Sequence, residues 1–176
     1  SQQNAQLIEL ALDLLPWHPQ TLTALDLFCG IGNFSIPLAL RGARVTGVEH
    51  NRRSIFWAQE NSLRAGLSNT HFITADVERQ LRALVQQQAR FDCILLDPPR
   101  QGLGKAAALL AKLAPERIIS VSCDPATLAR DLALITAHPD PGILARNALA
   151  TADSGQAVAR LPLLVRAANG KADAAF

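Results

Sequence analysis

Residues 22–35 read LTALDLFCGIGNFS, an apolar run that passes into a short turn containing two glycines. The run LTALDLF has the length and apolar character of a buried strand. Gly30 and Gly32 suit a tight turn in which the backbone can approach a ligand closely. Asn33 follows, and we expect it to cap a helix that begins at residue 34. The stretch therefore predicts a strand, a glycine turn and a helix, which is the opening unit of an α/β sheet.

Apolar runs and amphipathic stretches alternate along most of the remaining chain. We expect strands at residues 22–28, 44–49, 70–74, 91–97 and 117–122. The amphipathic stretches, which predict helices, lie at residues 2–15, 34–41, 52–65, 77–89, 105–113 and 126–137. This order indicates βαβ units with helices on both faces of the sheet. The sequence predicts a Rossmann-like α/β fold with a doubly wound, mostly parallel sheet.

The regular alternation stops near His138, where the sequence HPDPG ends the last predicted helix. We therefore take residues 1–137 as a core domain and residues 138–176 as an irregular extension that could complete the sheet. Residues 157–165 are compatible with one more strand, and Pro162 would place that strand at an edge. The chain has 176 residues, the size of one domain.

Composition narrows the possible classes of protein. A formal net charge of +2 neither requires nor excludes a nucleic-acid partner. The three cysteines are widely spaced without a CxxC pair, which indicates neither a disulfide framework nor a zinc site and suits the cytoplasm. The sequence contains no signal peptide and no apolar run long enough for a membrane helix. A chain that begins with Ser and has no Met is expected to be a processed product or a piece of a longer protein.

Glycines or polar residues stand at the ends of all five predicted strands. In chain order they are Gly30 and Gly32, Glu49, Asp76, Asp97 and Cys123. Ligands of open α/β sheets bind beyond the carboxyl ends of the strands, and an acid after the second strand commonly accepts ribose hydroxyl groups. The glycine spacing differs from GxGxxG, the pattern of pyrophosphate-binding loops. Each acid alone is more often a helix cap, but together the five strand ends predict a nucleoside-cofactor site.

Four motifs carry a resemblance to a known family: LDLFCGIGNFSIPLA, GVEHN, LLDPPRQGL and SVSCDPATLARDL. They resemble the RNA uracil-5-methyltransferases, which form 5-methyluridine in 23S ribosomal RNA and transfer RNA. The resemblance covers about residues 4–135. It implies that residues 1–137 form a class I methyltransferase core that uses S-adenosyl-L-methionine and acts on RNA.

The resemblance also implies a role for each matched position. The cofactor-binding residues would be Phe28, Gly30, Gly32, Asn33, Glu49, Asp76 and Asp97. Among them, Glu49 would hold the ribose hydroxyls, Asp76 would contact adenine, and Asp97 would lie near the methyl donor or the target base. Cys123 would be the catalytic nucleophile.

In the chemistry that the resemblance implies, the thiolate of Cys123 adds covalently to C6 of uracil, so that C5 can take the methyl group. This need for a thiolate explains why a cysteine would stand where a helix begins. Asp124 and Pro125 suit the N-cap and the first position of a helix. The helix dipole favours a thiolate at Cys123, whereas the carboxylate of Asp124 opposes it, and Arg100 or Arg130 could offset that carboxylate. Arg100 is also a candidate phosphate contact. We expect the other two thiols, Cys29 and Cys93, to be packing residues; His50, Arg52, Arg53, Phe56 and Trp57 are interpreted mainly as core and cap.

Several alternatives stay open at this stage. The family's catalytic base is a glutamate in a His-x-Glu motif that is missing here, and Asp173 is the nearest acid. This gap favours a non-catalytic remnant that binds cofactor or RNA. RNA cytosine-5 methyltransferases share the thiolate chemistry but usually carry a further cysteine where this chain has DPPR. Amino-group methyltransferases usually carry an aromatic residue at the position of Arg100, and a nicotinamide dehydrogenase would need another glycine spacing.

Overall fold

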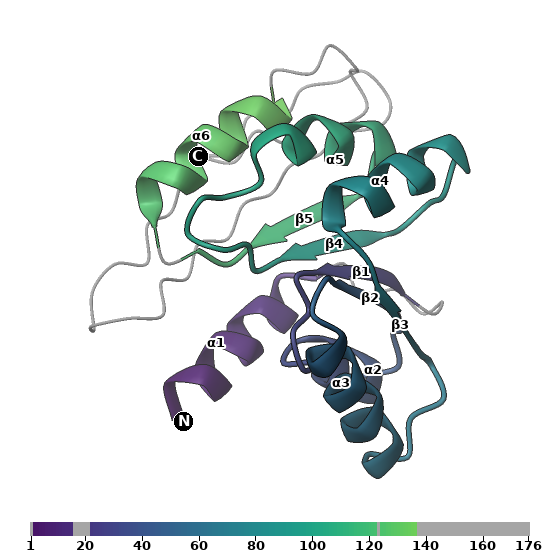
Figure 1. Cartoon of the computed structure of the whole chain (residues 1–176). Coiled ribbons are helices and arrows are strands. Elements are labelled where there is room, and N and C mark those ends of the chain that lie inside the picture. The colour runs from purple at the N-terminus through teal and green to yellow at the C-terminus, as the bar shows by residue number, and fades with distance from the viewer. Residues whose placement is uncertain (1, 16–21, 123, 137–176) are drawn as a thin grey trace.

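The computed structural model describes residues 2–15, 22–122 and 124–136, which form an α/β fold around one parallel sheet (Figure 1). The strands are β1 (Thr23–Leu27), β2 (Arg44–Glu49), β3 (Thr70–Thr74), β4 (Cys93–Leu96) and β5 (Arg117–Ser120). Their order in the sheet is β3-β2-β1-β4-β5, and all neighbouring pairs are parallel. The predicted Rossmann-like architecture is confirmed.

Helices cover both faces of this sheet. They are α1 (Gln2–Asp13), α2 (Ser35–Leu40), α3 (Arg52–Arg64), α4 (Val77–Gln86), the short 3-10 helix η1 (Gly104–Ala106), α5 (Ala107–Leu113) and α6 (Pro125–Thr136). Helices α1, α2 and α3 lie on one side, and α4, α5 and α6 on the other (Figure 1). The ends of the described elements differ from the sequence predictions by no more than three residues.

Strands β1 and β4 are mainly apolar because both of their faces are buried. Leu25 and Leu27 pack towards the helices α4, α5 and α6. Ala24 and Cys93 point to the opposite face and join the core under α1 and α2. This alternation is the ordinary period of a strand, and burial on two faces explains why the sequence shows continuous apolar runs.

The chain reverses its direction of winding beside β1. It proceeds from β1 outward through β2 and β3, and then returns to place β4 and β5 on the other side of β1. Backbone hydrogen bonds continue past the strand ends here, from the Cys29 N–H to Val48 O (3.1 Å) and from the Asp97 N–H to Leu27 O (3.3 Å). The ends of β1, β2 and β4 therefore share one edge at the switch point, where ligands of such sheets bind.

One local prediction is wrong. Asn33 does not cap α2, since Phe34 is the residue before the helix and no side chain bonds its first amides. Instead, the amides of Asn33 and Asn4 donate to each other's oxygen atoms (2.9 and 3.0 Å). The side chain of Asn33 is thus used to hold α1 against the glycine turn, a contact between residues far apart in sequence.

Some expectations fall outside the described residues. These are Cys123, the extension 138–176 with its possible strand at 157–165, and the candidate base Asp173. Within the described ranges, no helix combines the length and apolar character needed to cross a membrane.

Candidate functional site

The turn after β1 is built from residues with unusual backbone angles. Phe28, Gly30 and Gly32 all have positive φ, of 62°, 54° and 89°. The conformation costs little for glycine, but for a bulky residue such as Phe28 it is strained, and such strain is typical of functional sites. A Cβ added to Gly30 would meet nothing within 4 Å. The turn therefore presents its backbone to open space at the switch point.

A buried acid lies directly below this turn. Asp26 is fully buried, and the Ser35 hydroxyl donates a 2.5 Å hydrogen bond to its Oδ2. Its Oδ1 is buried and finds no hydrogen-bond partner among the described residues. Burial raises the pKa of Asp26 to about 7; the nearby Asp97 and Glu49 add to this effect and the Ser35 hydrogen bond opposes it. Asp26 was not among the predicted site residues, although a lone acid inside an apolar run is a recognisable signal in the sequence.

Glu49, at the end of β2, is mostly buried, with 8% of its surface exposed. Its Oε1 accepts a hydrogen bond from the Asn51 N–H (2.9 Å) and lies 2.7 Å from His50 Nδ1. No described residue bonds its second oxygen. Glu49 thus keeps one oriented carboxylate oxygen beside the glycine turn, which suits a hydroxyl donor.

The acids after β3 and β4 differ in their surroundings. Asp97 retains contact with solvent, but enough protein surrounds it for desolvation to raise its pKa. The hydrogen bond from its N–H to Leu27 O (3.3 Å) places it beside the end of β1. Asp76 is exposed and caps α4, since its Oδ1 accepts the Arg79 N–H (2.9 Å). Glu49 and Asp97 lie at the ends of the two strands that neighbour β1. Asp76 follows β3, the outermost strand on that side, at the same edge of the sheet.

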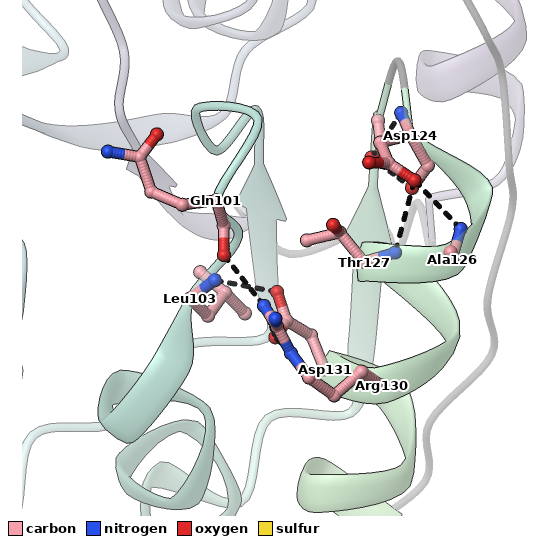
Figure 2. Close-up of polar contacts among 8 residues, drawn as sticks. Gln101, Leu103, Asp124, Ala126, Thr127, Arg130 and Asp131 are labelled. Atoms are coloured by element: carbon pink, nitrogen blue, oxygen red, sulfur yellow. Dashed lines mark hydrogen bonds and ion pairs between the residues drawn. The ribbon is translucent and has the colours of Figure 1, made fainter.

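The segment after β5 is held on both sides of residue 123. Ser122 Oγ accepts a hydrogen bond from the Asp124 N–H and donates to Asp124 O, both at 3.1 Å. Asp124 Oδ1 accepts the amides of Ala126 (2.9 Å) and Thr127 (3.2 Å), as Figure 2 shows. These bonds, with a smaller contribution from Arg130, lower the pKa of Asp124. The predicted helix cap is confirmed. In the sequence, Cys123 stands between Ser122 and Asp124, the two residues that these hydrogen bonds hold.

The other two thiols are buried, as expected of packing residues. Cys29 is 4% exposed and Cys93 is fully buried. Burial raises the pKa of Cys93 to about 12 and that of Cys29 well above its ordinary range. Neither thiol therefore has appreciable thiolate character at neutral pH.

The interpretation of α3 needs a correction. Phe56 and Trp57 are not core residues, since 53% and 40% of their surfaces are exposed. Their rings pack edge to face with centroids 5.4 Å apart. Asn51 caps the helix by accepting the amides of Arg53 (2.9 Å) and Ser54 (3.2 Å). The sequence pattern suggested burial, but the helix buries the opposite side, where Ile55 and Ala58 lie.

Comparison with known proteins identifies relatives of this chain. A family model described as tRNA (Uracil-5-)-methyltransferase matches residues 1–139. The 23S rRNA (uracil(1939)-C(5))-methyltransferase RlmD of Alkalilimnicola ehrlichii is 46% identical over 128 residues, which are 73% of this chain and 28% of that protein. The protein of the same name from Photobacterium angustum is 44% identical over 128 residues, 73% of this chain and 58% of that protein. The chain thus spans 28% and 58% of the lengths of these relatives.

Solved structures agree with this relationship. The Pyrococcus abyssi tRNA (uracil-54, C5)-methyltransferase in complex with S-adenosyl-L-homocysteine superposes with a TM-score of 0.63 and 29% identity, covering 76% of this chain and 31% of that chain. A SAM dependent methyltransferase from Agrobacterium tumefaciens gives a TM-score of 0.57 and 25% identity, covering 63% of this chain and 40% of that chain. These neighbours confirm the class I methyltransferase fold. Since the family model matches residues 1–139 of 176, the chain belongs to the tRNA (uracil-5-)-methyltransferase family.

Proposed function

We propose that this chain binds S-adenosyl-L-methionine at the switch-point edge and methylates C5 of uridine in RNA through Cys123. Family membership supports the reaction class, and two relatives are named for uracil-C5 methylation of ribosomal or transfer RNA. Action on such an RNA would place the protein in the cytoplasm.

The residues at the edge fit this cofactor. Bound there, it would supply a methyl group on a positively charged sulfonium. The open turn at Gly30 and the unpaired oxygen of Glu49 suit its methionine part and its ribose hydroxyls. The unpartnered Oδ1 of Asp26 is a further acceptor below the turn. The full set proposed to bind it is Phe28, Gly30, Gly32, Asn33, Glu49, Asp76 and Asp97.

Cys123 is proposed to activate the target base, because C5 of uracil is too weak a nucleophile by itself. Its thiolate would add to C6, so that an S–C6 bond forms and the electrons of the C5=C6 bond move to C5 as an enolate. C5 then takes the methyl group. Loss of the C5 proton to a base restores the double bond and expels the thiolate. The target base must leave its stack for this attack.

The observation that carries the proposal is the capped start of α6 directly after β5. Asp124, the residue after Cys123 in the sequence, caps this helix. The Val121 N–H donates a hydrogen bond to the carbonyl oxygen of Leu96 (2.8 Å), the last residue of the strand that leads to Asp97. A helix start favours a thiolate over a thiol. These contacts of its neighbours support a role for Cys123 at the edge that carries Glu49 and Asp97.

Methyl transfer can be tested with RNA that lacks base methylation. The chain is incubated with radiolabelled S-adenosyl-L-methionine and ribosomal or transfer RNA, and the nucleosides are then separated. We expect label in 5-methyluridine, lost in Cys123→Ala and retained in Cys93→Ala, a control for loss of a thiol outside the site. Label in 5-methylcytidine would instead favour a cytosine-5 enzyme. Cofactor binding without any transfer would contradict the proposal and favour a binding-only remnant.

A further inference from the structure

Two adjacent residues of α6 hold the loop that follows β4. Arg130 Nη2 donates a hydrogen bond to Gln101 O (2.6 Å), and Asp131 Oδ2 accepts the Leu103 N–H (2.6 Å). Figure 2 shows both side chains reaching from the helix to the loop. The loop residues lie 28 and 29 positions earlier in the sequence. These contacts therefore join the DPPRQG motif to the helix that begins after Cys123.

The carboxylate in this contact is deeply buried. Asp131 is 2% exposed, and its second oxygen, Oδ1, accepts from Arg130 Nη2 (3.1 Å) and Nε (3.3 Å). Both oxygens are therefore bonded, as a buried charge requires. Asp131 is buried, whereas about half of the Arg130 side chain is exposed. Replacing a buried ionic group by apolar residues is often neutral or stabilising, so the buried carboxylate is weak evidence for a role in stability alone. The pair fixes a backbone amide and a carbonyl in defined directions, which apolar contacts cannot do.

Gly102 shows how closely the loop approaches the helix. Its φ is +78°, and an added Cβ would lie 2.3 Å from Asp131 Oδ2, 2.4 Å from Thr127 Cγ2 and 2.7 Å from Arg130 Nη2. All three distances are too short for real contacts. Only glycine therefore permits this conformation and this approach. The loop and α6 form one closely fitted unit.

We propose that Arg130 and Asp131 are positioning residues that set the geometry between the loop after β4 and the start of α6. The loop carries Asp97 and Arg100 at its beginning, and the helix start follows Cys123. This inference rests on the proposed function, in which Asp97 helps to bind the methyl donor and Cys123 attacks the uracil that receives the methyl group. Attack on C6 needs the reacting atoms in near-attack geometry, and a displacement of about 1 Å can cost on the order of a hundredfold in rate.

The test compares exposed arginines that each form one ion pair. Arg130→Ala removes the contact to Gln101, and Arg130→Lys keeps a positive donor. Arg82→Ala is the matched control, because Arg82 is similarly exposed (57% against 52%) and pairs with Glu78 on α4. Four quantities are measured for each: the rate of covalent adduct formation with RNA containing 5-fluorouridine, the Kd for S-adenosyl-L-methionine, the melting temperature, and hydrogen exchange at the Leu103 amide.

In Arg130→Ala we expect adduct formation to slow by about tenfold or more, while the Kd and the melting temperature stay near wild type. Exchange at Leu103 should accelerate, Arg130→Lys should recover part of the rate, and Arg82→Ala should behave as wild type. An unchanged rate in Arg130→Ala would overturn the inference. So would a parallel loss of rate, affinity and melting temperature, since that would be a merely structural effect.

Failure of the proposed function gives a different result. If the wild-type chain binds the cofactor but forms no adduct, the uridine-methylating function is contradicted. Exchange at Leu103 then decides the positioning inference separately. Acceleration confined to residues 101–104 in Arg130→Ala supports it, and unchanged exchange contradicts it.

Discussion

At the scale of single residues, Asp26 is the group whose surroundings are least ordinary. It is fully buried in the central strand, with one oxygen bonded to Ser35 and the other without a protein partner. Burying such a carboxyl is unfavourable for folding, and its neighbours in the strand, Leu25 and Leu27, are apolar. Asp26 lies just before the strained turn at Phe28. A ligand at the switch point that bonds its free oxygen would offset the unfavourable free energy of burying this carboxyl.

The raised pKa of Asp26 makes the stability of the fold depend on pH. A carboxyl with a higher pKa in the folded chain stabilises the fold fully below its unfolded pKa of 3.8, and this contribution is lost as the pH rises to about 7. Asp26→Asn lacks this loss. Its free energy of unfolding relative to wild type should therefore increase between about pH 4 and about pH 7, by about 1.4 kcal/mol for each unit of the pKa difference.

Urea denaturation across this pH range checks that prediction. Asp13→Asn is the control, because Asp13 is an acid on the surface of α1 with 70% of its side chain exposed. A constant difference between Asp26→Asn and wild type from acid to neutral pH would show that the buried carboxyl does not titrate as described.

Glu49 offers a direct test of the cofactor site. Glu49→Gln retains an oxygen that can accept the Asn51 N–H but loses the negative charge available to the ribose hydroxyls. We expect S-adenosyl-L-methionine to bind about tenfold more weakly, the usual cost of weakening a charged hydrogen bond. Calorimetric titration measures this. Glu60→Gln on α3, whose carboxylate lies 3.9 Å from Arg64, should bind normally, and equal affinities for all three proteins would remove Glu49 from the site.

At the scale of elements, α6 connects the two proposed catalytic segments. Its start is capped by Asp124, and its second turn holds the loop after β4 through Arg130 and Asp131. The core side of the helix adds Leu128 and Leu132 to the main apolar cluster. Apolar packing places the helix on the sheet, whereas polar contacts set the positions of its start and of the loop.

The cap and the charge of Asp124 can be separated by two substitutions. Asp124→Ala removes the acceptor for Ala126 and Thr127, so it should lower the urea midpoint. Asp124→Asn keeps an acceptor, so its midpoint should stay near wild type. Both remove a negative charge next to Cys123, and we expect faster alkylation of that thiol by iodoacetamide. Equal destabilisation by both substitutions would contradict the capping role.

The elements of this fold could be predicted from sequence because they depend on local patterns. The apolar runs correctly marked five strands, and the Asp-Pro pair marked the start of α6. Strand β4 begins at Cys93, later than predicted, and Asp92 just before it accepts hydrogen bonds from the backbone and hydroxyl of Thr23 (both 2.7 Å). That contact joins residues 69 positions apart, and no local pattern contains it.

The candidate site was predictable in part for the same reason. The parallel arrangement of the strands brings Glu49 and Asp97 to one edge, and this arrangement follows from the βαβ pattern. The pairing of Asn33 with Asn4 and the contact of Asp131 with Leu103 depend on how separate elements pack. Side chains with several possible partners, such as Asn and Asp, cannot be assigned one from spacing alone.

At the scale of the whole molecule, the reversal of winding beside β1 organises the chemistry. It brings the glycine turn, Glu49 and Asp97 to the same edge as the capped helix after β5. Helices on both faces of the sheet cover its strands. Polar groups at the carboxyl ends of the strands are therefore the ones available to a ligand. Cys123 is proposed to act at this edge on a uracil in RNA.

The most direct measurement of that claim is the identity of the residue that becomes attached to RNA containing 5-fluorouridine. Fluorine at C5 cannot leave as a proton, so the methylated adduct should persist without a base. Trypsin places the three cysteines in separate peptides, residues 1–41, 91–100 and 118–130, and mass spectrometry distinguishes them. We expect a nucleotide on peptide 118–130 that requires S-adenosyl-L-methionine and disappears in Cys123→Ala. Cofactor binding without an adduct, or an adduct on another peptide, would contradict the account.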